Sequence, residues 1–290
     1  MKNFEYFSPQ NIKEACSLLS QYPEEAKVIA GGQSLLIILK QRLIIPNYLI
    51  DIKGISDLDY IRYDEEDGLR IGALTTHRTL ETSPVVREKF YMLAEMEKRL
   101  ATIQIRNWGT LGGNLCHGDP ASDLAPPLVA LDAEVKLTGP NGERVVKLEG
   151  FFKDYYETVL GVDEILTEIH VPTPSRGGGI YVKTSLRETD SALAGVATFL
   201  VLDPKDRKIC KNVRIVMGSV GPTPVRSKKV EDALKGQKID DRTIDKVAQM
   251  ASEDSQPISD IHGSEEYKKE MVKVLVRRTL KEAILRAEAS

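Results

Sequence analysis

The segment Arg106–Asn114 reads RNWGTLGGN and continues as LCHGDPASDLAPP to Pro127. An earlier glycine pair stands in VIAGGQSL at Val28–Leu35, between an expected buried strand at Lys27–Ala30 and an expected helix at Leu35–Leu43. Glycine tolerates positive φ and close backbone approach, so successive N–H groups beside such pairs can converge on an anion. The helix start after the first pair adds a favourable dipole. Both segments are therefore predicted to bind a diphosphate, although the first alone is explained equally well by a strand-to-helix turn without a ligand.

Neither glycine pair belongs to a common nucleotide motif. The patterns GxGxxG and GxxxxGK[ST] are absent from these segments, so a dinucleotide-binding Rossmann turn or a P-loop is not supported. Ser34 does not stand in a GxSxG elbow and is a poor candidate for a nucleophile. Asp123, downstream of Asn114, is suited to accept hydrogen bonds from ribose hydroxyls. It is equally suited to cap a helix at Leu124–Leu131, and the two roles are compatible.

Composition excludes several classes of function. The 290 residues carry 40 basic and 43 acidic side chains without a clustered basic face, so no nucleic-acid partner is expected. Three separated cysteines, Cys16, Cys116 and Cys210, form no CxxC pair, so we expect neither a metal site in this chain nor a disulfide framework. No apolar run approaches the roughly 18 residues that span a bilayer. A cytoplasmic protein without a transmembrane segment is predicted.

Turn signals divide the chain into three regions, at 1–55, 56–175 and 176–290, and the mixture of helices and strands predicts an α+β fold. The first region is predicted to be a small βαβ-like unit whose helix at Ser8–Tyr22 is capped by Ser8. The second is expected to open with a strand at Leu58–Arg62 and to end with one at Glu164–Val171. The third is predicted to contain a three-stranded antiparallel sheet followed by a helical bundle, with strands at Ile180–Leu186, Val196–Leu202 and Val213–Gly218.

These motifs, in this order, resemble the FAD-binding medium subunit of the molybdenum hydroxylases, the group that includes xanthine dehydrogenase and aerobic carbon monoxide dehydrogenase. The resemblance extends to IGALTTH at Ile71–His77, to Ile180–Lys183, to Ser191–Ala197 and to VLVRR at Val274–Arg278, and so covers nearly the whole chain. It implies a two-part FAD-binding domain of the p-cresol methylhydroxylase type followed by a C-terminal domain. The cysteine-rich insertion of some relatives is missing.

The resemblance implies a set of FAD-binding residues. The first loop would consist of Val28, Ile29, Ala30, Gly31, Gly32, Gln33, Ser34 and Leu35. The second loop would consist of Thr110, Leu111, Gly112, Gly113 and Asn114. Asp123 would lie near the ribose, and Leu100, Leu166 and Lys183 beside the flavin. A cation there would stabilise negative charge on the reduced flavin; alternatively, Lys183 is a surface residue on a strand.

The resemblance also implies a function. A large molybdopterin subunit would oxidise the substrate, and a small [2Fe-2S] subunit would pass the electrons to this FAD and on to an external acceptor. The assembly would be a dimer of heterotrimers. The four histidines, His77, His117, His170 and His262, are scattered, so no catalytic residue is assigned. The alternatives are a free-standing FAD-dependent oxidase or reductase and a non-catalytic FAD-binding scaffold protein.

Overall fold

The computed structural model describes residues 3–290 of the chain. Its N-terminal unit is a parallel sheet in the order β1-β3-β2, with helices α1 (Ile12–Gln21) and α2 (Leu35–Gln41) as connections. The strands are β1 (Glu5–Phe7), β2 (Ala26–Ile29) and β3 (Tyr48–Asp51). α1 buries Ala15, Cys16 and Leu19.

The structure corrects two features of this unit. The cap of α1 is Asn11, whose side chain accepts from the Glu14 amide at 2.9 Å, and not Ser8. The sequence does not predict β1, because three residues are too few to form a periodic pattern. In the structure they are mostly exposed. The strand structure of β1 comes from pairing with β3.

The middle of the chain forms an antiparallel sheet in the order β4-β5-β10-β6-β7. Its strands are β4 (Ile61–Asp64), β5 (Gly68–Gly72), β6 (Glu134–Gly139), β7 (Gly142–Lys147) and β10 (Ile165–Val171). The strand predicted at Leu58–Arg62 is confirmed only at Ile61 and Arg62, which belong to β4, because Leu58 ends the 3₁₀ helix η1 (Ser56–Leu58). A second 3₁₀ helix, η2 (Leu148–Gly150), and a small hairpin of β8 (Phe152–Asp154) and β9 (Glu157–Thr158) precede β10.

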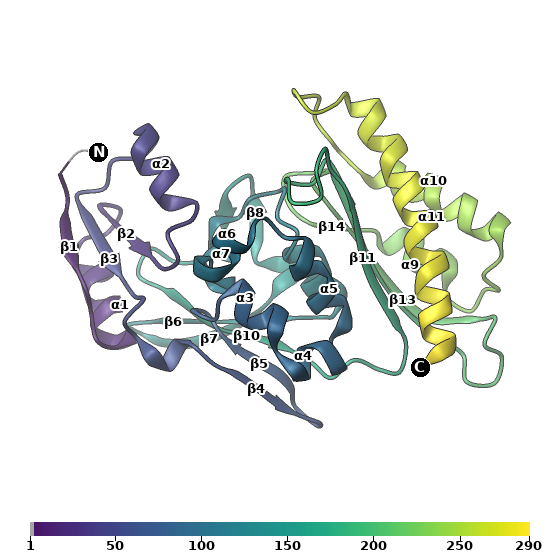
Figure 1. The fold of residues 1–290 in the computed structure, drawn as a ribbon, viewed down its shortest axis with the longest axis horizontal. Helices are drawn as coiled ribbons and strands as arrows, with labels where there is room; N and C mark the ends of the chain where they lie inside the picture. The colour runs from purple at the N-terminus through teal and green to yellow at the C-terminus, as the bar shows by residue number, and fades with distance from the viewer. Residues whose placement is uncertain (1–2) are drawn as a thin grey trace.

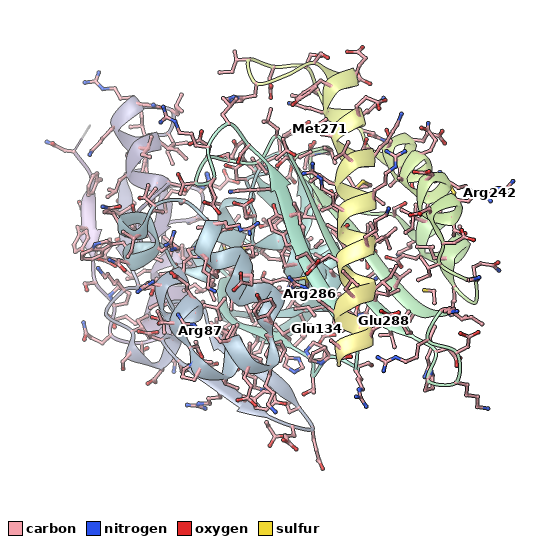
Figure 2. All side chains as sticks on the ribbon, turned by 45° about the vertical axis from the view of Figure 1, so that its right-hand side comes forward. Arg87, Glu134, Arg242, Met271, Arg286 and Glu288 are labelled. Carbon is pink, nitrogen blue, oxygen red and sulfur yellow. The ribbon has the colours of Figure 1, made fainter. Side chains whose placement is uncertain are left out.

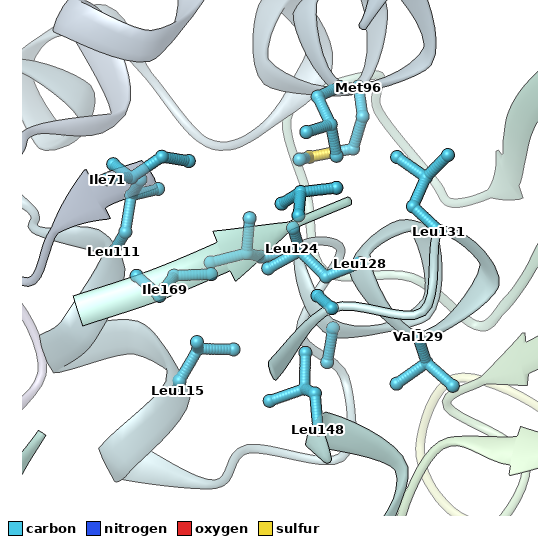
Figure 3. Packing of buried hydrophobic residues seen from close by; sticks show 14 of the residues in the cluster. Ile71, Met96, Leu111, Leu115, Leu124, Leu128, Val129, Leu131, Leu148 and Ile169 are labelled. Atoms are coloured by element: carbon cyan, nitrogen blue, oxygen red, sulfur yellow. The ribbon is translucent and has the colours of Figure 1, made fainter. Parts of the chain in front are cut away.

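Short helices fill the chain between β5 and β6. They are α3 (His77–Thr82), α4 (Pro84–Lys89), α5 (Tyr91–Arg99), α6 (Ile103–Trp108), α7 (Leu111–His117) and α8 (Ala125–Ala130). Figure 1 shows α3 to α7 between the five-stranded sheet and the C-terminal sheet. Leu111 and Leu115 of α7 enter the core beside Ile71 of β5 and Ile169 of β10 (Figure 3). This packing stabilises the position of the second loop, because burial of each Leu or Ile side chain contributes roughly 1.5–3 kcal/mol to the free energy of folding.

The C-terminal sheet is antiparallel in the order β11-β12-β13-β14. Its strands are β11 (Gly178–Thr184), β12 (Ala194–Leu202), β13 (Cys210–Gly218) and β14 (Val225–Arg226). The predicted three-stranded sheet is therefore one strand short, since the two residues of β14 are too few for a sequence signal. Helices α9 (Lys228–Leu234), α10 (Asp241–Asp254) and α11 (Glu265–Ala289) cover one face (Figure 1).

The other face of the C-terminal sheet packs against α5 and α8. α11 crosses the first face, with Met271 toward one end and Arg286 and Glu288 toward the other (Figure 2). Arg286 donates to the Gly179 carbonyl at 2.9 Å and lies over the Tyr91 ring of α5, 4.9 Å from its centroid. This contact ties the C-terminal helix to the middle of the chain. Within residues 3–290, every helix falls short of the length and apolar character needed to cross a bilayer.

Candidate functional site

A cavity of about 560 Å³ lies between the first loop and the segment from α6 to α8, a volume typical of small-molecule sites. Most of the residues predicted for the site line it. They are Val28, Ile29, Ala30, Gly31, Gly32, Gln33, Ser34, Leu35, Leu100, Thr110, Gly112, Gly113, Asn114, Asp123 and Leu166. Leu111 and Lys183 do not line it. Leu111 faces the core and is 1 % exposed (Figure 3).

The first loop presents consecutive backbone N–H groups as hydrogen-bond donors. Among the described residues, no protein acceptor is found for the backbone N–H groups from Gly31 to Leu35. Gly32 supports this turn with a φ of +72°, and the Gln33 side chain donates to the Gly31 carbonyl at 3.2 Å. α2 has only seven residues, so the donors themselves contribute more than its dipole. Converging free N–H groups of this kind suit an anion such as a diphosphate.

The second loop differs from the sequence-based expectation. Thr110 is the cap of α7, and its hydroxyl accepts from the Gly113 amide at 3.2 Å. The amides of Leu111, Gly112 and Asn114 donate to the carbonyls of Thr75, Ala73 and Thr110 at 3.0, 2.9 and 3.0 Å. The backbone N–H groups of this loop are therefore already bonded, and the expectation that they are free for a diphosphate is wrong. The loop can contribute side chains instead.

The glycines serve protein packing more than ligand access. A Cβ on Gly31 would lie 2.1 Å from the Trp108 carbonyl oxygen. A Cβ on Gly112 would lie 2.6 Å from the Ala73 Cβ. Glycine is thus required at both positions because another part of the backbone passes there, and Gly31 joins the first loop to the end of α6.

Asp123 lines the cavity and belongs to a buried cluster of polar side chains. It is 6 % exposed, and its carboxylate accepts from the Tyr181 hydroxyl at 2.7 Å and from the Lys183 ammonium at 2.6 Å. Burial raises the pKa of Asp123, an effect that Lys183 opposes, and burial also raises the pKa of Tyr181 well above its ordinary value. The predicted helix cap by Asp123 is wrong, because Leu124 occupies the cap position of α8 and no side chain caps that helix among residues 3–290.

Lys183 lies behind Asp123. Its ammonium also donates to the carbonyls of Arg99 and Asp190, at 3.1 and 2.8 Å, and its side chain is only 5 % exposed. The alternative of a surface lysine is therefore wrong. Lys183 instead compensates the buried charge of Asp123 and joins β11 to two loops near the cavity.

Several residues of the cavity wall escaped the sequence reading. They are contributed by distant segments and include His77, Ser122, Tyr156, Leu160, Glu164 and the segment Thr189–Ser191. His77 ends the quoted IGALTTH motif, which was the available signal for it. His117 and Tyr156 meet at the wall with ring centroids 5.2 Å apart, and burial lowers the pKa of His117. Burial raises the pKa of Cys116 to about 12.

The wall has the two properties that FAD requires. Free N–H groups of the first loop suit its diphosphate, whereas Leu100, Ala101, Ile105 and Leu166 provide apolar surface for planar rings. Arg106 supports this apolar side, since its guanidinium donates to the carbonyls of Leu100 and Ala101 at 2.7 and 2.9 Å. The residues present therefore fit the cofactor.

Comparison with known proteins agrees with this geometry. Residues 2–174 match the family model of the FAD binding domain in molybdopterin dehydrogenase, and residues 180–283 match that of the CO dehydrogenase flavoprotein C-terminal domain. The chain is 37% identical to the carbon monoxide dehydrogenase medium chain of Hydrogenophaga pseudoflava, over 97% of this chain and 96% of that one. It is also 37% identical to the nicotine 6-hydroxylase medium subunit of Paenarthrobacter nicotinovorans, over 96% of each.

Solved structures give the same result. Carbon monoxide dehydrogenase from Hydrogenophaga pseudoflava matches with a TM-score of 0.95 at 37% identity, covering 98% of both chains. Quinoline 2-oxidoreductase from Pseudomonas putida 86 matches with a TM-score of 0.93 at 31% identity, covering 99% of both. The chain therefore belongs to the FAD-binding medium subunits of the molybdenum hydroxylase family.

Proposed function

We propose that this chain is the electron-transfer flavoprotein of a molybdenum hydroxylase complex and that it holds one FAD in the cavity between its two loops. The observation that carries the proposal is the run of backbone N–H groups from Gly31 to Leu35 on the cavity wall, for which residues 3–290 provide no acceptor. Buried or half-buried backbone donors without a protein acceptor are rare, so a ligand acceptor is expected there.

Each part of the wall has a proposed role. The first loop binds the diphosphate through its backbone, and Asn114 adds a side-chain donor from the second loop. Asp123 accepts from a hydroxyl of the ribose or ribityl chain, because a carboxylate oxygen that already accepts one hydrogen bond retains a second lone pair. Leu100 and Leu166 pack against the rings. FAD, when bound, accepts and releases electrons, and the protein provides binding, orientation and electrostatics.

The proposed assembly has partners that hold the other cofactors. The chain covers 96% or more of the relatives described above, which are named as medium chains or subunits, so we propose a small [2Fe-2S] subunit and a large molybdopterin subunit. Electrons pass from the [2Fe-2S] clusters through FAD to an external acceptor. We further propose a dimer of heterotrimers in the cytoplasm, and three structural units at 1–55, 56–175 and 176–290.

The proposal is tested by co-expressing the chain with the genes adjacent to its own and purifying the complex. The expected result is one FAD per copy of this chain, with flavin absorption that bleaches when a substrate of the large subunit is added without oxygen. A purified complex without flavin would contradict the proposal. Turnover of a small substrate by the isolated chain would instead support a free-standing oxidase or reductase, and FAD that never exchanges electrons would support a scaffold.

A further inference from the structure

A buried histidine–carboxylate pair lies beneath the second loop. His77 is 2 % exposed, and Glu97 of α5 is fully buried. The His77 Nδ1 atom lies 3.0 Å from both carboxylate oxygens of Glu97, and its Nε2 atom lies 3.5 Å from Asn114 Nδ2. The His77 backbone amide donates to the Gly109 carbonyl at 3.0 Å. Buried polar groups in such a chain act as a unit and fix one another's orientation.

The hydrogen bonds of Ser122 determine which way the Asn114 amide points. The Leu124 backbone amide donates to Ser122 Oγ at 3.3 Å. The Ser122 hydroxyl hydrogen is then free to be donated to Asn114 Oδ1, at 2.6 Å. With Oδ1 held by Ser122, the Nδ2 atom faces His77.

This orientation assigns the proton of His77. An amide nitrogen only donates, so His77 Nε2 must accept from Asn114 Nδ2. The imidazole is then neutral with its proton on Nδ1, and it donates that proton to the Glu97 carboxylate. The other charged groups near the pair, Glu81 of α3 and Arg106 of α6, are bonded to each other at 2.9 Å. Within residues 3–290, His77 is the only side chain that hydrogen-bonds Glu97.

We propose that Glu97, His77 and Ser122 are positioning residues, which hold the Asn114 amide so that its second N–H faces the cavity and donates to the FAD diphosphate. The inference deepens the proposed function and rests on it. It follows from two observations: Asn114 lines the cavity, and the backbone amides of the second loop already have acceptors. The donors that this loop can offer to an anion are therefore side chains, the Thr110 hydroxyl and the Asn114 amide, and Asn114 is the one that contacts His77.

The first test is a titration of the full-length, flavin-free chain with FAD. His77→Leu removes the acceptor at Nε2, and we expect it to weaken FAD binding about tenfold, as for loss of one oriented hydrogen bond to a charged group. His77→Gln, whose side-chain oxygen can accept at the same place, should restore most of that loss. His170→Leu is the matched control, since His170 lies outside the cavity and bonds the Asp67 carbonyl. Equal binding by wild type and His77→Leu would overturn the inference.

A double-mutant cycle tests whether His77 acts through Asn114. In an Asn114→Ala background, His77→Leu should cause no further loss, because the side chain that it positions is gone. A further tenfold loss would contradict a positioning role. Ser122→Ala disturbs the opposite end of the chain and should weaken binding in the same direction, about threefold. It provides a second route if His77→Leu does not fold.

Nitrogen-15 NMR of labelled imidazoles in the flavin-free chain tests the orientation without FAD. We expect His77 to carry its proton on Nδ1 in wild type and in Glu97→Gln, which keeps a side-chain oxygen as acceptor. A proton on Nε2 in wild type would overturn the inference. Failure of the wild type to bind FAD would instead overturn the proposed function and the diphosphate contact with it.

Discussion

Gly31 shows why a short sequence motif can identify a site and still be misread. The sequence indicated a backbone that leaves room for a ligand, whereas the structure places the Trp108 carbonyl where a side chain would stand. Gly31 therefore packs the first loop against the end of α6. No pattern within the first loop could reveal this, because the contact is with a segment far along the chain.

Gly31→Ala is predicted to destabilise the chain by about 1–3 kcal/mol, as expected for overpacking against backbone, and to weaken FAD binding because the two loops move apart. The measurement is urea unfolding together with an FAD titration. Gly150→Ala is the matched control, since an added Cβ there meets no atom within 4 Å. Gly31→Ala with unfolding and binding equal to those of the control would refute the packing role.

The resemblance implies that Lys183 lies beside the flavin; in the structure its ammonium donates to Asp123, and its side chain does not line the cavity. Lys183→Met leaves Asp123 buried with Tyr181 as its remaining side-chain donor. Breaking a buried ion pair from one side typically costs about 3–5 kcal/mol, and we predict a loss of that size in urea unfolding. Asp123→Asn combined with Lys183→Met should be more stable than Lys183→Met alone, because no uncompensated charge remains. A double variant less stable than Lys183→Met alone would show that Asp123 and Lys183 are not coupled in this way.

At the scale of elements, longer segments were predicted well and short ones were not. β10 and β12 lie where strands were predicted, at Glu164–Val171 and Val196–Leu202, and α2 lies where a helix was predicted after the glycine pair. α7 was not predicted as a helix because it contains Gly112 and Gly113, which disfavour helix. Its formation depends on the Thr110 cap and on burial of Leu111 and Leu115. Tertiary packing, which the local sequence does not contain, thus determines the second wall of the site.

An ion pair joins β7 to the loop before β10. Both carboxylate oxygens of Glu164 accept from Arg144 at 2.7 Å, and one also accepts from the Gly161 amide at 2.7 Å. The hydrogen bonds from Arg144 and, to a smaller extent, from the Gly161 amide hold the pKa of Glu164 below its ordinary value. A lowered folded-state pKa means that the stabilisation is fully present above the ordinary pKa of Glu. It is lost as the pH falls through the folded-state value.

Glu164→Gln is accordingly predicted to cost about 1–2 kcal/mol of stability at pH 7, and the difference from wild type should shrink below about pH 4. Glu143→Gln, at an exposed position 3.8 Å from Lys136, serves as the control and should change stability by less than about 0.5 kcal/mol. The measurement is guanidinium unfolding across this pH range. A difference between wild type and Glu164→Gln that does not vary with pH would contradict the assignment.

At the scale of the whole molecule, the cavity exists because three sheets and their helices bring distant segments together. Nearly all of the residues that the resemblance indicates for FAD line this cavity, together with many others that it does not indicate. The sequence could not show that the amides of the second loop are bonded, whereas those of the first find no acceptor within residues 3–290. That asymmetry depends on α7 packing against Ala73 and Thr75, which precede it by more than thirty residues. It makes the first loop the principal anion site and the second loop a support with one oriented side chain.

The most direct test of this account is a crystal structure of the FAD-loaded chain. We predict that the diphosphate oxygens accept hydrogen bonds from backbone N–H groups between Gly31 and Leu35, and that the second loop contributes its contact through the Asn114 side chain. A diphosphate bound outside the first loop, or one held by the backbone amides of Leu111 and Gly112, would contradict the account.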